Sequence, residues 1–253
     1  MRRNKSPKHI YNANTSQTPG SKCWPSEADW VSFNKTLNGA LIRSVPPGSV
    51  CYSDQPNYDP EACKVAATQW FNSTWHAEDP FSIDYPIWTN NSCNPIWPNG
   101  TSITGDPNAG ARGCSIGAYP AYVVNVTTPK QIGDALKWAN AKNIRIVVKS
   151  TGHSYSGRSI GYGSLSIWTH NLRGIEYIED FHPASCKVKD TLNAARVAAG
   201  TTGGEIQAAL AKHHTIAVTG ANPGTGVVGW LTGGGHGPLS TTYGKQRQFT
   251  KCI

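Results

Sequence analysis

A chain of 253 residues that is 38% hydrophobic and 15% charged has a globular composition, because disordered chains combine low hydrophobicity with high charge. The net charge of +8 is carried by the two ends. Residues 1–10 and 245–253 hold seven of the 23 Lys and Arg residues and no Asp or Glu, which leaves 16 basic and 15 acidic residues in 11–244. Nucleic-acid binders concentrate basic residues on a folded face, so we expect no nucleic-acid partner.

Seven cysteines favour a disulfide-stabilised segment over a metal site. None stands in a C-x-x-C pair, so a zinc site is not indicated and we expect no metal. Five of the seven lie in the first 115 residues, among many Trp, Pro and Asn residues. Cys51–Cys63 and Cys93–Cys114 would be local pairings, but the sequence leaves the connectivity open, with free buried thiols as the alternative.

The acceptor pattern for N-linked glycans predicts a secreted protein. Asn-x-Ser/Thr occurs seven times, at Asn4, Asn14, Asn34, Asn72, Asn90, Asn99 and Asn125. The first twenty residues are basic but lack the apolar stretch of a signal peptide. Either the protein is not secreted or its true N-terminus lies outside this chain. No transmembrane run is present, and we expect no membrane association.

The chain divides by composition into four parts. Residues 1–21 are polar and are predicted to be a disordered tail, and 22–115 form a Cys- and Trp-rich irregular region with helices near 25–37 and 60–75. Residues 116–244 alternate strand and helix patterns. Residues 245–253 are a charged tail that departs from the pattern before it.

The pattern after residue 116 predicts an α+β or α/β domain. A strand at 119–126 is followed by a helix at 131–141, with Thr127/Thr128-Pro129 as its capping sequence, and by a strand at 144–149. This is a β-α-β unit. Further strands are predicted at 164–169, 175–178, 194–199 and 215–219, a helix at 204–213, and a long glycine-rich loop at 220–244.

Two loops have the residues for binding a phosphorylated or planar ligand. The first, KSTGHSYSG at 149–157, follows a strand directly, and its glycines allow backbone N–H groups to approach an anion. An ordinary Gly/Ser connection is the alternative. The second has seven glycines between Gly220 and His236. A structural loop rarely needs so many, because each glycine carries an entropic cost on ordering, whereas a backbone wrapped against a large planar or phosphorylated ligand does need them. Neither loop matches the P-loop or Rossmann pattern.

Together, VVKSTGHSYSGRS, SLSIWTHNLRGIEYI and GVVGWLTGGGHGPLSTTYG resemble the vanillyl-alcohol oxidase / p-cresol methylhydroxylase (PCMH) superfamily of FAD-linked oxidases. The resemblance is greatest to its secreted fungal berberine-bridge-like and oligosaccharide-oxidase-like branch. It implies an α+β fold: a PCMH-type FAD-binding domain of two α/β subdomains, incomplete here, after a disulfide-rich N-terminal region. Relatives are about twice this length, so the chain looks truncated, and their catalytic residues lie beyond the glycine loop.

The resemblance also implies which residues hold FAD. His153 matches the histidine that bonds covalently to the flavin 8α-methyl group. Asn222 stands where some relatives have a second attachment cysteine, so we expect attachment through His153 only. His236 and Tyr243 are candidates for a catalytic base, with packing against the flavin or its loop as the favoured alternative. The other implied FAD-binding residues are Ser150, Thr151, Gly152, Ser154, Gly157, Ser159, Gly220, Gly226, Val227, Gly229, Gly233, Gly234, Gly235 and Gly237.

The implied function is an FAD-dependent oxidase that passes hydride from a small alcohol, sugar or amine to covalently bound flavin and then to O₂. We expect a monomer. One alternative is a catalytically inactive, truncated secreted glycoprotein fragment of such an oxidase. Another is a lectin-like binding module formed by 22–115, indicated by its many Trp and Asn residues.

Overall fold

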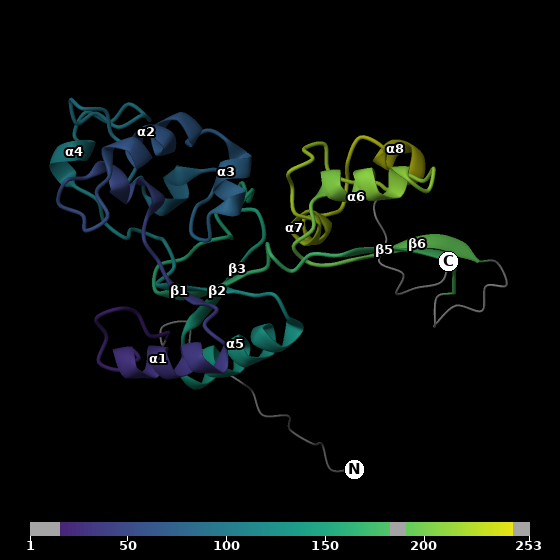
Figure 1. The fold of residues 1–253 in the computed structure, drawn as a ribbon, viewed down its shortest axis with the longest axis horizontal. Helices are drawn as coiled ribbons and strands as arrows, with labels where there is room; N and C mark the ends of the chain where they lie inside the picture. Colours follow the sequence, from purple (N-terminus) through teal and green to yellow (C-terminus); the bar gives the residue numbers. More distant parts are fainter. Residues whose placement is uncertain (1–15, 183–190, 245–253) are drawn as a thin grey trace, which may run out of the picture.

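A four-stranded sheet lies at the centre of the computed structural model, which describes residues 16–182 and 191–244 (Figure 1). Its strand order is β1 (Leu41–Arg43), β2 (Tyr122–Asn125), β4 (Ser164–Trp168) and β3 (Arg145–Lys149). β2, β4 and β3 are parallel, and β1 is antiparallel to β2. The predicted β-α-β unit is confirmed, with α5 (Pro129–Ala141) between β2 and β3.

Two helices cover one face of this sheet. α5 begins at a capping box of Thr128 and Gln131, with Pro129 at its first position. It lies beside α1 (Glu27–Thr36) under the sheet (Figure 1). Their shared core consists of aromatic and aliphatic side chains from both helices and the strands: Trp30, Phe33, Leu37, Tyr122, Val124, Val126, Ala135, Ala139, Ile144, Leu165 and Ile167. Burial of these apolar side chains is the main stabilising contribution to this layer.

The opposite face of the sheet packs against the N-terminal region. Because side chains alternate across a strand, Val123 faces away from Val124 and joins a second buried cluster with Phe81, Tyr119 and Trp168. The region above this face contains α2 (Pro60–Gln69), α3 (Ser73–Glu78), α4 (Ala109–Arg112) and two 3₁₀ helices, η1 (Pro47–Cys51) and η2 (Pro86–Thr89).

The N-terminal region is therefore part of the same folded body as the strands after residue 116. It contributes α1 to the main core and β1 to the sheet, so the change of composition near 115 does not separate two cores. Gln17 lies in the segment predicted to be disordered, but it forms an isolated parallel β-bridge with Ile144. Its N–H donates to Asn143 O at 2.8 Å. Residues 1–15 and 245–253 lie outside the described residues.

A smaller unit follows the main sheet. β5 (Ile175–Phe181) and β6 (Leu192–Val197), near the strands predicted at 175–178 and 194–199, form an antiparallel pair, and α6 (Gly203–Ala211) follows. Thr202 and Glu205 form a capping box at the start of α6. α7 (Val227–Thr232) and α8 (Ser240–Tyr243) complete this unit beside the β5–β6 ribbon (Figure 1).

Three predictions of secondary structure are wrong in detail. The helix predicted at 60–75 is two helices. α2 ends before Trp70, whose side chain is buried, and Asn72 then caps α3 by accepting from Thr74 N at 3.0 Å. The strand predicted at 215–219 is irregular, since its backbone accepts from the Gln207 side chain and pairs with no strand in the described ranges. The loop predicted at 220–244 contains α7 and α8.

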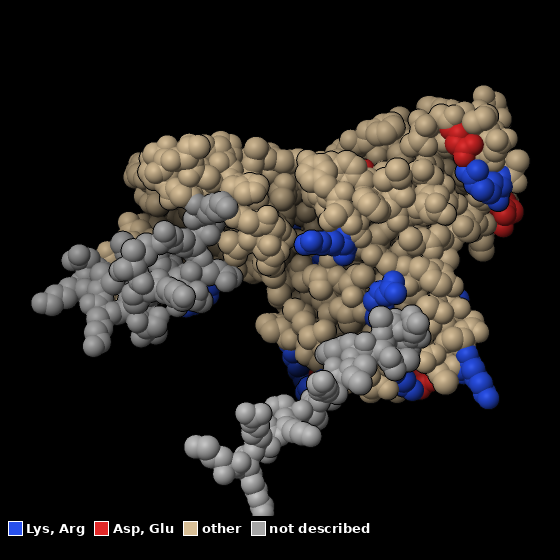
Figure 2. Space-filling view, turned by 180° about the vertical axis from the view of Figure 1, so that it is seen from behind, with Lys and Arg blue, Asp and Glu red and all other residues tan. Residues whose placement is uncertain are grey.

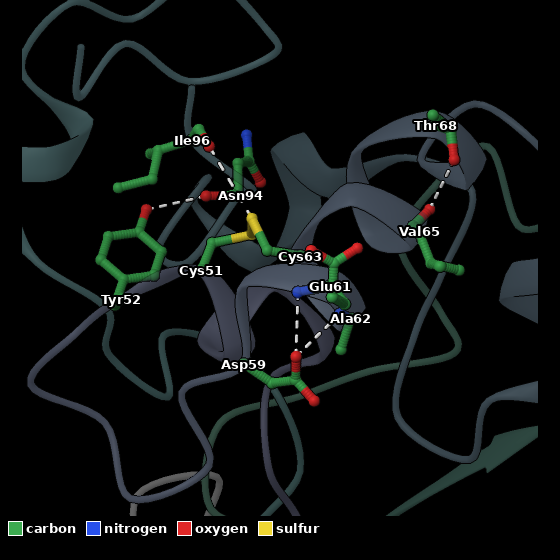
Figure 3. Close-up of a disulfide and its surroundings, with 10 residues drawn as sticks. All are labelled: Cys51, Tyr52, Asp59, Glu61, Ala62, Cys63, Val65, Thr68, Asn94 and Ile96. Atoms are coloured by element: carbon green, nitrogen blue, oxygen red, sulfur yellow. Dashed lines mark hydrogen bonds between the residues drawn. A yellow bond between two sulfur atoms is a disulfide. The ribbon is translucent and has the colours of Figure 1, made fainter. Parts of the chain in front are cut away.

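Both local disulfide pairings are confirmed. Cys51–Cys63 joins η1 to α2, and Cys93–Cys114 closes the segment after η2. Figure 3 shows the Cys51–Cys63 bond beside Tyr52, whose hydroxyl donates to Asn94 O at 2.7 Å. Asp59 caps α2 just before Cys63. The bond therefore fixes a helix against an otherwise irregular segment. Cys23 is exposed and free, and Cys186 and Cys252 lie outside the described residues.

The surface is poor in charge. Lys, Arg, Asp and Glu side chains are scattered among uncharged residues on the face shown in Figure 2. Among residues 16–182 and 191–244, no helix is long and apolar enough to span a bilayer. The same residues contain no group of three or more His, Cys, Asp or Glu side chains placed to hold a metal ion.

Cys51→Ser is expected to lower the free energy of unfolding by about 3 kcal/mol, because Cys51–Cys63 closes a short loop in the unfolded chain. Urea unfolding of the oxidised protein measures this. Cys23→Ser is the control, because Cys23 is exposed and unpaired. Equal unfolding midpoints for the two variants would show that the bond contributes nothing.

Candidate functional site

The first glycine loop begins where β3 ends and turns sharply at Gly152. The backbone φ of Gly152 is +84°, a left-handed conformation that favours glycine. A Cβ there would lie 3.1 Å from Lys149 Cε and 3.2 Å from Ser82 O. The loop therefore packs directly against the N-terminal region, and the turn places His153 where the loop meets that region.

The second glycine loop closes onto the first. Gly226 donates its N–H to Thr151 Oγ1 at 3.3 Å, and a Cβ on Gly226 would lie 2.5 Å from Ser150 Oγ. Gly224 lies against His153, where its Cβ would be 3.6 Å from Nε2. The structure thus brings Ser150, Thr151 and His153 together with the 224–226 segment. The approach at Gly226 needs glycine because the space a Cβ would fill is already occupied by Ser150.

His153 is largely buried and faces a carboxylate. Its Nε2 lies 3.6 Å from Asp84 Oδ2, and the two side chains are 12% and 13% exposed. Neither ring nitrogen makes a hydrogen bond with the described residues, and Ser150 Oγ and Asp84 Oδ1 are likewise buried without one. Buried polar atoms are normally satisfied. This cluster of unsatisfied atoms marks the junction as a place where a polar ligand or a covalent partner fits.

A buried lysine lies directly beneath the same loop. Lys149 Nζ donates to His76 O at 2.9 Å and to Asp79 O, and lies 5.5 Å from the centre of the Trp168 ring. Burial lowers the pKa of Lys149 to about 7, against the opposing influence of Asp79 and Asp84. A neutral amine can still donate both hydrogen bonds.

Burial also shifts the pKa of the carboxyl and imidazole groups around Lys149. Burial raises the pKa of Asp79, whose carboxylate accepts from the N–H groups of Phe81 and Ser82. It also raises the pKa of Asp84. It lowers the pKa of His76, whose Nε2 lies 2.6 Å from Trp70 O.

The remaining predicted residues lie around this junction rather than in it. Ser154 Oγ accepts from Arg158 N at 3.2 Å, Gly157 has φ +67° against the Trp88 ring, and Ser159 is buried. Gly220 and Gly237 meet each other, since a Cβ on Gly237 would lie 1.9 Å from Thr219 O and 3.6 Å from Gly220 Cα.

The predicted residues of α7 lie farther out. Val227 starts the helix and donates its N–H to Thr201 O at 2.9 Å, while Gly229 is exposed. Gly233, Gly234 and Gly235 end the helix, and their N–H groups donate to carbonyls of α7. His236 and Tyr243 are exposed, and the His236 carbonyl accepts from Trp230 Nε1 at 2.6 Å. The structure does not bring these residues to the side chain of His153.

Sequence reasoning missed Asp84, Lys149 and Gly224. Lys149 stands at the start of the KSTGHSYSG loop, and a lysine at the end of a predicted β-strand is a detectable pattern. Asp84 has no such pattern, because its contact with His153 joins segments 69 residues apart. Gly224 falls inside the predicted glycine loop but was not singled out.

Comparisons with known proteins identify the family of the chain. Residues 120–251, just over half of the chain, match the family described as FAD binding domain. The chain belongs to this family of FAD-binding domains, within the vanillyl-alcohol oxidase / PCMH superfamily. This confirms the resemblance, and the α+β fold class is confirmed by the sheet and helices described above.

Two relatives from fungi illustrate the relationship. The VAO-type flavoprotein oxidase VAO615 of Thermothelomyces thermophilus is 40% identical over 240 residues, which are 93% of this chain and 39% of that protein. The FAD-linked oxidoreductase ZEB1 of Gibberella zeae is 35% identical over 227 residues, 89% of this chain and 37% of that protein. The chain therefore spans about two fifths of the length of these relatives.

Solved structures show the same fold over the same span. The VAO-type flavoprotein MtVAO615 from Myceliophthora thermophila C1 superposes with a TM-score of 0.80 at 38% identity, covering 91% of this chain and 40% of that one. MtVAO713 from the same organism also gives 0.80, at 34% identity, covering 91% and 39%.

The residues present fit FAD. Tight glycine turns and a buried serine hydroxyl without a hydrogen-bond partner suit a diphosphate that approaches the backbone closely. The imidazole of His153, whose nitrogens make no hydrogen bond with the part of the chain that the structure describes, would suit attachment to a flavin ring. His153, Ser150, Thr151, Gly152 and Gly226 are the residues that would hold the group.

Gly226→Ala is expected to lower the free energy of unfolding by about 1–3 kcal/mol, because its Cβ would overlap Ser150 and force the two glycine loops apart. Gly229→Ala is the matched control: a Cβ at Gly229, within α7, meets nothing within 4 Å. Alanine there should stabilise the helix by up to about 1 kcal/mol. Equal effects of the two substitutions would contradict the close packing of the loops.

Lys149→Met is expected to lower the free energy of unfolding by about 2–4 kcal/mol at pH 7, because two buried carbonyl oxygens lose their donor. The effect should depend on pH. Between the pKa of about 7 in the folded protein and the ordinary 10.5, the unfolded chain binds more protons. The contribution of Lys149 to stability therefore grows as pH rises through this range.

Urea unfolding from pH 6 to 9.5 tests this pH dependence. The difference between wild type and Lys149→Met should widen above pH 7. Lys64→Met, at an exposed surface lysine, is the control and should change stability by less than about 0.5 kcal/mol at every pH. Parallel curves for wild type and Lys149→Met would contradict the lowered pKa.

Proposed function

We propose that this chain binds FAD covalently through His153 and forms part of an oxidase. The observation that carries the proposal is the junction of two glycine loops around a buried histidine whose ring nitrogens have no hydrogen-bond partner among the described residues. Membership of the FAD-binding domain family supports the cofactor. Bound FAD would supply hydride acceptance, which no amino-acid side chain provides.

The chain's own residues would position the cofactor. Gly152 and Gly226 leave room for backbone approach, and the hydroxyls of Ser150 and Thr151 offer donors beside them. His153 would fix the flavin by a covalent bond and so prevent its loss by dissociation. The two loops come from opposite sides of the junction, so FAD would also hold the main sheet and the smaller unit together.

The activity of the whole protein follows the names of the relatives, which are an oxidase and an oxidoreductase. We infer hydride transfer from a small alcohol, sugar or amine to the flavin, followed by reoxidation by O₂. Because this chain spans about two fifths of those relatives, the substrate-binding residues and catalytic base are assigned to no residue here.

We also propose that the protein passes through the secretory pathway. Two disulfides support this, since such bonds persist in oxidising compartments. Of the glycosylation acceptors, Asn72, Asn90 and Asn99 are exposed. We further propose that the protein is a monomer, that its substrate is a small molecule, and that it has no nucleic-acid or membrane partner.

A second candidate function is a folded secreted glycoprotein without turnover. It is favoured by the share of the relatives' length that this chain spans, about two fifths, and by a cavity of about 750 Å³ beside the β5–β6 ribbon, α6 and α7, whose lining of apolar side chains such as Tyr177, Val218 and Leu231 stays open. Ile216 and Val228 on this surface are 61% and 42% exposed. Turnover of any alcohol, sugar or amine above the free-flavin background would exclude this candidate.

His153→Ala is expected to abolish covalent flavin. The full chain is produced in a eukaryotic secretory host and precipitated with acid, and the absorbance of pellet and supernatant is compared. In wild type the yellow colour should remain with the pellet, and in His153→Ala it should appear in the supernatant or be lost. His213→Ala is the control, because His213 is exposed and stacks on the Tyr177 ring of β5. A colourless wild-type pellet would disprove the covalent attachment.

A further inference from the structure

Asp84 contacts the first glycine loop in two ways, and both act at the residue pair Gly152–His153. Its backbone N–H donates to Gly152 O at 3.4 Å, and its Oδ2 lies 3.6 Å from His153 Nε2. Both side chains are nearly buried. The carboxylate therefore faces one particular nitrogen of the imidazole in a region of low dielectric, where such an interaction is stronger than in water.

This orientation distinguishes the two ring nitrogens. A neutral imidazole carries its proton on one nitrogen and a lone pair on the other. The partner of one nitrogen decides which tautomer is present. A carboxylate beside Nε2 favours the tautomer protonated there, which leaves the lone pair on Nδ1. No hydrogen bond to the described residues uses Nδ1, so that lone pair is available for reaction.

We propose that Asp84 is a positioning residue for flavin attachment, which holds the Nε2 proton of His153 and directs Nδ1 to form the covalent bond. The proposal rests on the proposed attachment through His153. Nδ1 bonds to the 8α carbon of the flavin, and that carbon loses one proton. The electron pair of the broken C–H bond passes to the flavin ring, which is reduced by two electrons.

The remaining atoms and electrons are balanced by molecular oxygen. His153 gives up the Nε2 proton as its Nδ1 becomes substituted, and Asp84 stabilises the positive charge on the ring until that proton leaves. Dioxygen takes two electrons and two protons and becomes hydrogen peroxide, which returns the attached flavin to its oxidised form. Dioxygen is thus the required oxidant, and Asp84 remains a carboxylate throughout.

The surroundings of Asp84 set the pH at which it can act. The titratable groups that face it are His153 from the first glycine loop, His76 from α3 and Lys149 from β3. Burial raises the pKa of Asp84 from its ordinary value, and these three groups oppose that rise when charged. A protonated Asp84 no longer attracts the Nε2 proton, so attachment should slow as pH falls through the raised pKa.

The test is the rate of covalent incorporation of FAD into the full-length apoprotein, measured by flavin fluorescence of the denatured chain on a gel. Asp84→Asn should slow incorporation by roughly 10- to 100-fold, the usual loss when the carboxylate behind a working histidine is removed. Non-covalent FAD binding, measured by quenching of flavin fluorescence before attachment, should change less than about 3-fold. Glu78→Gln, an exposed carboxylate on the preceding helix α3, is the matched control and should behave as wild type.

A pH profile separates positioning from a merely structural role. In wild type the incorporation rate should fall on the acid side at a pH above the ordinary range of a carboxylate. In Asp84→Asn the midpoint of this acid limb should move, because the imidazole of His153 still titrates but no carboxylate titrates beside it, whereas a structural defect would lower the rate equally at every pH. If Asp84→Asn does not fold, Asp84→Glu should fold and still slow incorporation. The linkage isomer of the flavin peptide from wild type, determined by NMR, should be Nδ1.

The outcomes distinguish this inference from the proposed function. No covalent flavin in wild type would disprove attachment through His153 itself. Covalent flavin in wild type together with an unchanged rate and pH profile in Asp84→Asn would overturn only the role of Asp84. Linkage through Nε2 would overturn it as well, because that nitrogen is the one that faces the carboxylate.

Discussion

The buried amine of Lys149 is the contact on which the site depends. It ends the edge strand β3, and its hydrogen bonds go to carbonyls of His76 and Asp79, in a segment about seventy residues earlier in the chain. A buried amine must find acceptors because leaving it unpaired is costly. The segment from His76 to Asp84 is thereby held at the end of β3. The loop that carries His153 begins at the next residue. The position of the histidine therefore depends on this long-range contact within the chain.

The rest of the site depends on glycines, because the missing Cβ lets neighbouring segments approach closely. Gly152, Gly157 and Gly226 each approach a neighbour so closely that a Cβ would lie within about 3 Å of it. Their neighbours belong to three different parts of the chain: the segment before Asp84, the η2 helix and the end of β3. The glycines let these parts meet, and the polar atoms left between them, on Ser150, His153 and Asp84, lack hydrogen bonds within the described residues. The backbone at this junction is closely packed, but several buried polar side-chain atoms have no hydrogen-bond partner in the described ranges. A bound flavin would supply partners for them.

The parts that could be predicted from the sequence are those fixed by local interactions. The β-α-β unit from β2 to β3 has a capping box, an N-terminal proline and helical periodicity within a few residues of each other. The two disulfides join nearby cysteines. The break between α2 and α3 depends on burial of Trp70 in a tertiary core, and α7 forms within a glycine-rich stretch, against local propensity. The pairing of β1 with β2 and the contact of Asp84 with His153 bring distant segments together, and no local pattern encodes either.

The N-terminal region therefore forms a wall of the site. Asp84 faces His153 from one side. On the other side the Trp88 ring packs on Gly157, and its Nε1 donates to Tyr155 O at 3.2 Å. Both residues lie in the short stretch between α3 and Cys93, whose disulfide to Cys114 ties its far end. Because the same stretch carries the partner of the histidine and the support of its loop, oxidation of these cysteines and assembly of the flavin site are expected to be coupled. A cysteine-rich segment that composition marks as irregular is in this way a structural component of the candidate flavin site.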